Sequence, residues 1–161
     1  MRLDRDHYMM IIAKAVSLRS ACKSRQVGSI LVDVHGYVLS TGYNSPAKGV
    51  PECNPCRRSG IESGRGLEGC MSTHSEANAL LQCADIRKID TIYVTISPCF
   101  GCLKLLLNTN CKRICFINSY PNQESEDVWK EMGREWVQIK YPTRARSILE
   151  SLARIPELMS K

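Results

Sequence analysis

The chain has 161 residues, of which 43% are hydrophobic and 24% are charged, and its formal net charge is +6. This composition is typical of a globular protein and excludes an intrinsically disordered one, and the length predicts a single domain over residues 1–161. No apolar run approaches the length of a membrane span, and the charged residues at 4–7 are not typical of a signal peptide. We therefore expect a cytoplasmic protein without a membrane partner, whose modest positive charge favours anionic ligands only weakly.

Periodicity predicts the first elements in chain order. Apolar residues at helical spacing predict a helix over 6–21. Two β-rich runs on either side of His35-Gly36 then predict a β-hairpin with a short turn. Residues 44–72 are rich in Gly, Pro, Ser and Cys and predict a long loop. Loops of this length are uncommon inside a compact domain, and they are usually functional or held by a metal.

The rest of the chain alternates between helices and strands. We expect a helix at about 74–85, and a further helix that opens with Ser97 as N-cap and Pro98 at the first helical position. The other predicted elements are strands at TIYVTI, KRICFI and EWVQIK, a helix near 124–132 and a basic tail helix within 142–161. Strands that alternate with helices indicate an α/β layer sandwich.

The stretch STHSEANALL, residues 72–81, has two interpretations. Thr73 and Glu76 have the spacing of a capping box in front of an apolar helix, which would make Glu76 structural. His74 and Glu76 also form half of a zinc deaminase signature, H-x-E. Residues further along the chain decide between them.

Those residues are Pro98, Cys99 and Cys102, which follow H-x-E after 21 intervening residues and complete the deaminase pattern with P-C-x-x-C. His74, Cys99 and Cys102 would supply three zinc ligands and leave the fourth tetrahedral position for water. Each ligand pair lies at a predicted helix start, where backbone N–H groups favour thiolate over thiol. Glu76 would then move protons beside the metal. A thioredoxin-like redox pair at Cys99 and Cys102 is disfavoured, because it gives His74 and Glu76 no role.

With these residues the chain resembles the deoxycytidylate deaminases, including the late-competence and bacteriophage types. The resemblance runs from about 8 to 141 and includes RQVGSILV, STGYNSPAKG, HSEANALLQC, TIYVTISPCFGC and NSYPN. It implies a three-layer α/β/α sandwich with a mixed sheet of about five strands. It also implies hydrolysis of dCMP to dUMP and ammonia, which supplies dUMP for thymidylate synthesis. Glu76 would pass a proton from the attacking water to ring N3. The family usually has Ala where this chain has Ser75.

The resemblance also implies substrate contacts. Asn44 would contact the nucleotide, Ser24 and Arg25 would lie near its phosphate, and Tyr120 would lie near the nucleotide. Each has a structural alternative: a turn residue for Asn44, a solvated helix end for Ser24 and Arg25, and a half-buried aromatic at a strand end for Tyr120.

A second zinc is predicted around the long loop. Related deaminases carry one bound from these regions, and a structural set of four cysteines would hold the loop in place. The alternatives are free surface thiols or a redox pair at Cys53 and Cys56. The predicted ligands are Cys22 at the end of the first helix, Cys53, Cys56 and Cys70. Cys83, Cys111 and Cys115 are expected to be small core residues.

Many members of the family are hexamers that dCTP activates and dTTP inhibits. The resemblance implies an effector site after Asn44, here at Lys48 and Gly49, and a homo-oligomer, a hexamer in the family pattern. Lys48 occupies a position that is often Gly, where it would either bind a triphosphate or block the backbone approach.

Two other functions remain open at this point. An RNA adenosine or cytidine deaminase would use the same zinc core. A zinc-stabilised nucleic-acid-binding module would instead use the basic tail, although such a tail is more often a solvated face. The basic residues in question are Lys140, Arg144, Arg146, Arg154 and Lys161.

Overall fold

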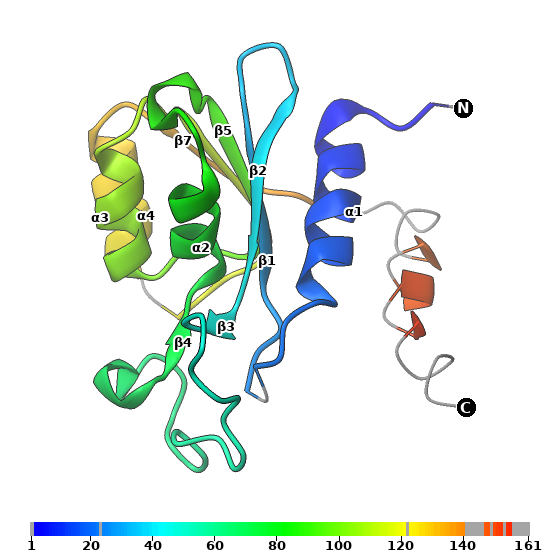
Figure 1. The fold of residues 1–161 in the computed structure, drawn as a ribbon. Coiled ribbons are helices and arrows are strands. Elements are labelled where there is room, and N and C mark those ends of the chain that lie inside the picture. Colours follow the sequence, from blue (N-terminus) through cyan, green and yellow to red (C-terminus); the bar gives the residue numbers. More distant parts are fainter. Residues whose placement is uncertain are drawn as a thin grey trace.

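A five-stranded sheet forms the middle layer of the structure, with helices on both faces (Figure 1). The computed structural model describes residues 2–22, 24–121, 123–140, 147–148, 150–152 and 154–155. The helices are α1 (Arg5–Ser17), α2 (Ser75–Gln82), α3 (Phe100–Leu107) and α4 (Gln123–Glu131), with short 3₁₀ turns at η1 (Leu67–Gly69) and η2 (Ile86–Lys88). The strands are β1 (Gly28–Val32), β2 (Val38–Tyr43), β3 (Ser45–Pro46), β4 (Ser72–Thr73), β5 (Thr91–Ile96), β6 (Arg113–Asn118) and β7 (Glu135–Gln138).

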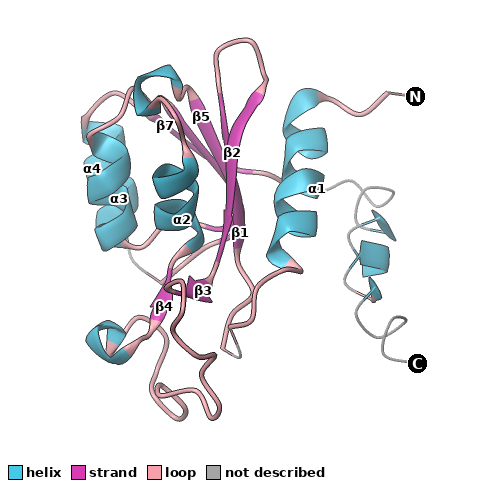
Figure 2. Ribbon diagram, viewed as in Figure 1, coloured by secondary structure: helices cyan, strands magenta, loops and turns pink. Residues whose placement is uncertain are grey.

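The sheet is mixed, with the strand order β2-β1-β5-β6-β7. The pairs β1–β2 and β1–β5 are antiparallel, whereas β5–β6 and β6–β7 are parallel. Helix α1 covers one face of the sheet, and α2, α3 and α4 cover the other (Figures 1 and 2). The predicted three-layer α/β/α sandwich with a mixed sheet of about five strands is therefore confirmed.

Successive side chains of the central strands point to opposite faces of the sheet and pack into two separate hydrophobic cores. In β5, Ile92 and Val94 pack in the core that also contains Trp129 of α4, whereas Tyr93 packs in the core that contains Met10 of α1. All five are 0–1% exposed. Burial of a large apolar side chain contributes about 1.5–3 kcal/mol to folding, so this alternation fixes which face of the sheet each helix covers.

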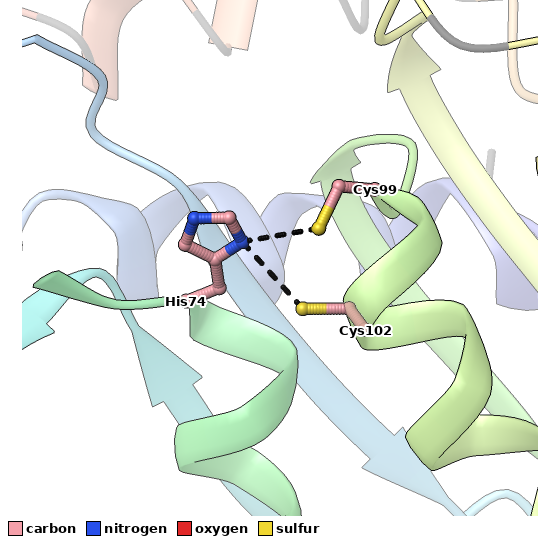
Figure 3. A group of neighbouring side chains, drawn as sticks. All are labelled: His74, Cys99 and Cys102. Atoms are coloured by element: carbon pink, nitrogen blue, oxygen red, sulfur yellow. Dashed lines mark hydrogen bonds between the residues drawn. The ribbon is translucent and has the colours of Figure 1, made fainter. Parts of the chain in front are cut away.

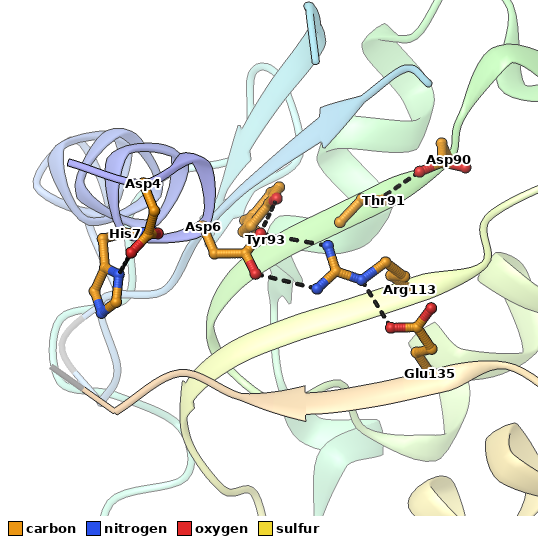
Figure 4. Close-up of polar contacts among 8 residues, drawn as sticks. All are labelled: Asp4, Asp6, His7, Asp90, Thr91, Tyr93, Arg113 and Glu135. Carbon is orange, nitrogen blue, oxygen red and sulfur yellow. Dashed lines mark hydrogen bonds and ion pairs between the residues drawn. The ribbon is translucent and has the colours of Figure 1, made fainter. Parts of the chain in front are cut away.

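A half-buried ion pair between Asp6 and Arg113 ties α1 to the sheet (Figure 4). Asp6 accepts hydrogen bonds from Tyr93 Oη at 2.6 Å and from Arg113 Nη1 and Nη2 at 3.3 and 3.1 Å. Arg113 also donates from Nε to Glu135 Oε2 at 3.0 Å. One guanidinium on β6 thus connects α1 to β7 across the sheet.

Two predicted helix boundaries are wrong. Ser97 does not cap α3, because its hydroxyl accepts a hydrogen bond from Tyr120 N at 2.7 Å, and the N-cap is Cys99 instead. Helix α1 ends at Ser17, before the predicted boundary, because the Ser17 hydroxyl bonds back to Lys14 O and the following N–H groups form tight turns. Cys22 therefore lies beyond the helix and does not end it.

The long loop is closed at its base by a short β-pair. Ser45 and Pro46 of β3 pair with Thr73 and Ser72 of β4. The side chain of Asn78 reinforces this closure by donating to Tyr43 O and Ser45 Oγ. The two ends of the predicted 44–72 loop therefore meet at the start of α2.

The C-terminal predictions fall mostly outside the part of the chain that the structure describes. Arg144, Arg146 and Lys161 of the predicted basic tail are among these residues. Within the described ranges, none of the helices combines the length and apolar character that crossing a membrane requires.

Candidate zinc centre

Helix α2 packs closely against β2 because the residue of β2 at the contact, Gly42, has no side chain. A Cβ atom built on Gly42 would lie 2.1 Å from Ser75 O and 2.4 Å from Ala79 N. Any side chain at Gly42 would therefore push the helix away from the sheet. The close contact sets the start of α2, where His74 is the N-cap residue.

Three predicted ligands meet between the starts of α2 and α3 (Figure 3). His74 Nδ1 lies 3.4 Å from Cys99 Sγ and 3.6 Å from Cys102 Sγ, and all three ligand atoms lie within 4.8 Å of one another. Nitrogen and sulfur ligands about 2.1 and 2.3 Å from a tetrahedral zinc are themselves about 3.5 Å apart. The donor set and its spacing therefore fit a zinc ion with a fourth position left open.

The pKa values of the two thiols shift in opposite directions. The hydrogen bond with Cys102, together with His74, lowers the pKa of the Cys99 thiol, and the same hydrogen bond and burial raise the pKa of Cys102. The hydrogen bond with Cys99 raises the pKa of His74. Cys99, as the N-cap of α3, also sits at the positive end of a helix. The site thus stabilises negative charge on the Cys99 sulfur, and thiolate is the form of cysteine that binds a metal.

Glu76 is not a capping residue. His74 is the N-cap of α2, and its side chain makes no capping hydrogen bond. Glu76 is instead 4% exposed, and its Oε2 accepts a hydrogen bond from Ser75 Oγ at 2.9 Å. Burial raises the pKa of Glu76, and the nearby His74 opposes that shift. A buried carboxyl with a raised pKa beside a metal site is suited to accept and return a proton.

A cavity of about 200 Å³ opens onto His74, Glu76 and Cys99. The predicted substrate residues Ser24, Arg25, Asn44 and Tyr120 all line it. Sequence reasoning missed Arg57, Arg58 and Ser63, which line the same cavity from the long loop. The adjacent arginines were the only local signal, and no periodic pattern indicates that this part of the loop borders the cavity.

Asn44 has a structural task inside this cavity. Its Oδ1 accepts a hydrogen bond from Ser75 N at 2.8 Å, and its Nδ2 donates to Arg25 O at 3.1 Å. Ser20 Oγ donates to its backbone carbonyl. The buried amide therefore couples the Arg25 segment to the start of α2, which carries the metal ligand and the buried carboxyl.

The remaining cysteines fall into two groups. Cys22, Cys53, Cys56 and Cys70 all line the cavity and are half-buried. Among the described residues, however, the group that brings three or more ligand atoms within 4.8 Å is His74, Cys99 and Cys102 alone. Cys111 and Cys115 are fully buried, as expected for core residues, and Cys83 is half-buried against the core.

The predicted effector residues lie outside the cavity. Lys48 and Gly49 are exposed, in a turn closed by Val50 N and Ala47 O at 2.9 Å. Gly49 has a φ of 83°, and a Cβ built on it would have no neighbour within 4 Å.

The sequence matches the cytidine and deoxycytidylate deaminase zinc-binding region over residues 3–118. It is 37% identical over 123 residues to the deoxycytidylate deaminase of Mycobacterium phage D29, which covers 71% of this chain and 95% of the phage protein. It is 30% identical over 154 residues to the deoxycytidylate deaminase of Saccharomyces cerevisiae, covering 92% of this chain and 49% of the yeast protein.

A solved structure shares the architecture. The dCMP deaminase of cyanophage S-TIM5, crystallised in complex with dCMP and dUMP, superposes with a TM-score of 0.68 at 26% identity. The match covers 86% of this chain and 99% of the cyanophage chain.

Proposed function

Because the chain belongs to the family of cytidine and deoxycytidylate deaminases, we propose that it hydrolyses dCMP to dUMP and ammonia. The observation that carries this proposal is a nitrogen–sulfur–sulfur ligand set beside the buried Glu76, in a cavity that Arg25 also lines. The complex of the cyanophage deaminase with dCMP and dUMP supports the same substrate and product. The dUMP formed would serve thymidylate synthesis.

The proposed roles follow from the contacts. His74, Cys99 and Cys102 would hold zinc, which when bound supplies a Lewis acid that lowers the pKa of water. Glu76 accepts a proton from the attacking water and delivers it to N3 of the cytosine ring, while the water oxygen bonds to C4. Glu76 next takes the proton of the new C4 hydroxyl and gives it to the amino nitrogen. The C4–N bond then breaks, the C4–O bond becomes a carbonyl, and the nitrogen leaves as ammonia. Ser75 restrains the Glu76 carboxylate through its hydrogen bond at Oε2.

A free nucleotide suits the cavity better than a nucleic-acid strand. The cationic side chains of Arg25, Arg57 and Arg58 line it, and an arginine fork matches a phosphate group. Nucleic-acid deaminases need a channel with stacking aromatic residues for flanking nucleotides. Tyr120 is the one aromatic residue among those that line this cavity in the described structure, which supports a nucleotide monophosphate as substrate.

An ammonia-release assay on dCMP, deoxycytidine and a cytosine-containing oligonucleotide tests the proposal. We expect kcat/KM to be highest for dCMP. Equal or higher kcat/KM on the oligonucleotide would favour the RNA or DNA deaminase alternative, and no release from any substrate would favour a zinc-stabilised binding module.

A second, structural zinc on Cys22, Cys53, Cys56 and Cys70 belongs to the same proposal. All four residues lie along one cavity, and Arg25 N donates a hydrogen bond to Cys22 Sγ at 3.5 Å. Gathering their sulfur atoms around one ion would require the loop to tighten, because the structure does not bring three of them within 4.8 Å. Metal binding commonly supplies the free energy for such a rearrangement.

The family resemblance supports three further proposals, which concern regulation, assembly and location. We propose that dCTP and dTTP act at the exposed turn with Lys48 and Gly49, that the chain forms a homo-oligomer of the hexameric type, and that it works in the cytoplasm. Deaminase rates with each triphosphate and a light-scattering mass test the first two points. A monomeric mass or a rate unaffected by either triphosphate would refute them.

A further inference from the structure

Three segments that are distant in the sequence meet at one wall of the cavity. Arg25 donates a hydrogen bond from Nη2 to Ser63 Oγ. The guanidinium of Arg25 also lies over the ring of Tyr120, with Cζ 5.4 Å from the ring centroid. Next to Ser63, a Cβ built on Gly64 would lie 3.6 Å from the Tyr120 hydroxyl, so this turn packs directly against the tyrosine.

The 58–65 segment is folded so that it presents Ser63 to Arg25. Arg58 donates from Nε and Nη2 to Arg65 O at 3.1 and 2.7 Å and thereby closes the segment on itself. A tight turn at its tip is closed by Arg65 N and Glu62 O at 3.1 Å. Gly64, with a φ of 88°, occupies the third position of this turn, where a positive φ suits glycine. Ser63 is thus held in place by contacts within its own segment that do not involve Arg25.

These contacts orient the guanidinium. An arginine side chain has five N–H donors, and in the described structure only Nη2 of Arg25 is used in a hydrogen bond. The Ser63 hydroxyl accepts this bond and retains its own proton for donation. The cation–π contact with Tyr120 further restricts where the guanidinium can lie, so its other donors stay on this wall of the cavity. An arginine held in this way loses less conformational entropy when an anion binds.

We propose that Ser63 is a positioning residue that orients Arg25 for the 5′-phosphate of a nucleoside monophosphate. The inference rests on the proposed function and adds the source of its preference for phosphorylated substrates. Ser63 acts through Arg25 and does not contact the reacting atoms, so its removal weakens binding of the phosphate without slowing the chemical step. Substrates without a phosphate do not depend on it.

Ser63→Ala tests this inference through a comparison of dCMP with deoxycytidine. We expect KM for dCMP to rise roughly threefold to tenfold, with kcat unchanged and with kcat/KM on deoxycytidine unchanged. Ser63→Thr keeps the hydroxyl and should restore the wild-type KM. Calorimetry in a Glu76→Gln background, in which turnover is slowed on the order of 10²-fold or more, should give the same change in Kd for dCMP.

Ser59→Ala is the matched control, because Ser59 lies on the same loop but is exposed and does not line the cavity. An unchanged KM and Kd for dCMP in Ser63→Ala would overturn the inference. So would equal losses on dCMP and deoxycytidine, because they would mean that the segment supports the whole cavity and not the phosphate contact. If the wild-type chain fails to deaminate dCMP, the proposed function fails, while the calorimetric comparison of nucleotide with nucleoside still decides the role of Ser63.

Discussion

The hydroxyl of Ser75 donates a hydrogen bond to the carboxylate of its neighbour Glu76, at 2.9 Å from Oε2. Both residues are buried at the first turn of α2. The backbone N–H of Ser75 is itself held by Asn44 Oδ1. Ser75, which lies between His74 and Glu76 in the sequence, therefore contacts the carboxylate directly and restrains Glu76.

Glu76→Gln separates a proton-transfer role from a structural one. Glutamine keeps the size of the side chain and can still bond to Ser75, so we expect the fold and the bound zinc to be retained. Because the amide cannot accept a proton from water, kcat should fall on the order of 10²-fold or more. Zinc content and circular dichroism serve as controls, and near-normal turnover with intact zinc would show that Glu76 is not the proton carrier.

Metal analysis after exhaustive dialysis counts the zinc sites. We expect about two zinc ions per chain, one catalytic and one structural. Cys99→Ser should lose the catalytic ion and all activity, because the ligand atoms of His74, Cys99 and Cys102 surround one point. Cys53→Ser should lose the other ion and unfold at a lower temperature.

Cys83→Ser is the matched control, since Cys83 is half-buried against the core and does not line the cavity. One zinc per wild-type chain would remove the structural site and leave the catalytic one. Loss of both ions in each variant would mean that the two sites are not separate.

Gly42→Ala should displace α2 and with it the metal site. The new Cβ would lie 2.1 Å from Ser75 O, a contact that the backbone must relieve by moving. Overpacking of this kind costs about 1–3 kcal/mol of unfolding free energy. When the fall in kcat/KM is expressed as a free energy, we expect it to exceed this loss of stability. Gly69→Ala, where a Cβ meets nothing within 4 Å and φ is not positive, is the control. Wild-type activity in Gly42→Ala would contradict the close approach as the determinant of helix position.

Asp6→Asn should weaken the fold in a pH-dependent way. Burial acts to raise the pKa of Asp6, but the hydrogen bonds from Arg113 and Tyr93 outweigh it and lower the pKa below its usual value. A lowered folded-state pKa means that the carboxylate contributes stability above its unfolded pKa of about 3.9 and loses it as pH falls further. Urea unfolding should show a loss of about 1–3 kcal/mol at pH 7 in the variant.

The same measurement at pH 3 provides the internal control for Asp6. The difference between wild type and variant should shrink there, because the wild-type carboxyl begins to take up its proton. A difference that is independent of pH would mean that the side chain acts by packing alone.

The sequence by itself determined the identity and spacing of the predicted zinc ligands and most of the secondary structure. H-x-E and P-C-x-x-C are local patterns, and in the structure each lies at the start of one helix. The alternation of Ile92, Tyr93 and Val94 likewise follows from the two-residue period of a strand between two apolar layers.

The tertiary structure alone decided the boundaries and the substrate side of the cavity. The backbone N–H of Tyr120 donates a hydrogen bond to the Ser97 hydroxyl, and the N-cap of α3 is Cys99. This contact joins residues 23 positions apart, so no local sequence pattern predicts it. Arg25 and Ser63 are 38 positions apart, and they meet because the 44–72 loop is closed by the β3–β4 pair. Local propensity fixes what each segment can form, whereas the partners of a polar side chain depend on which segments the fold brings together.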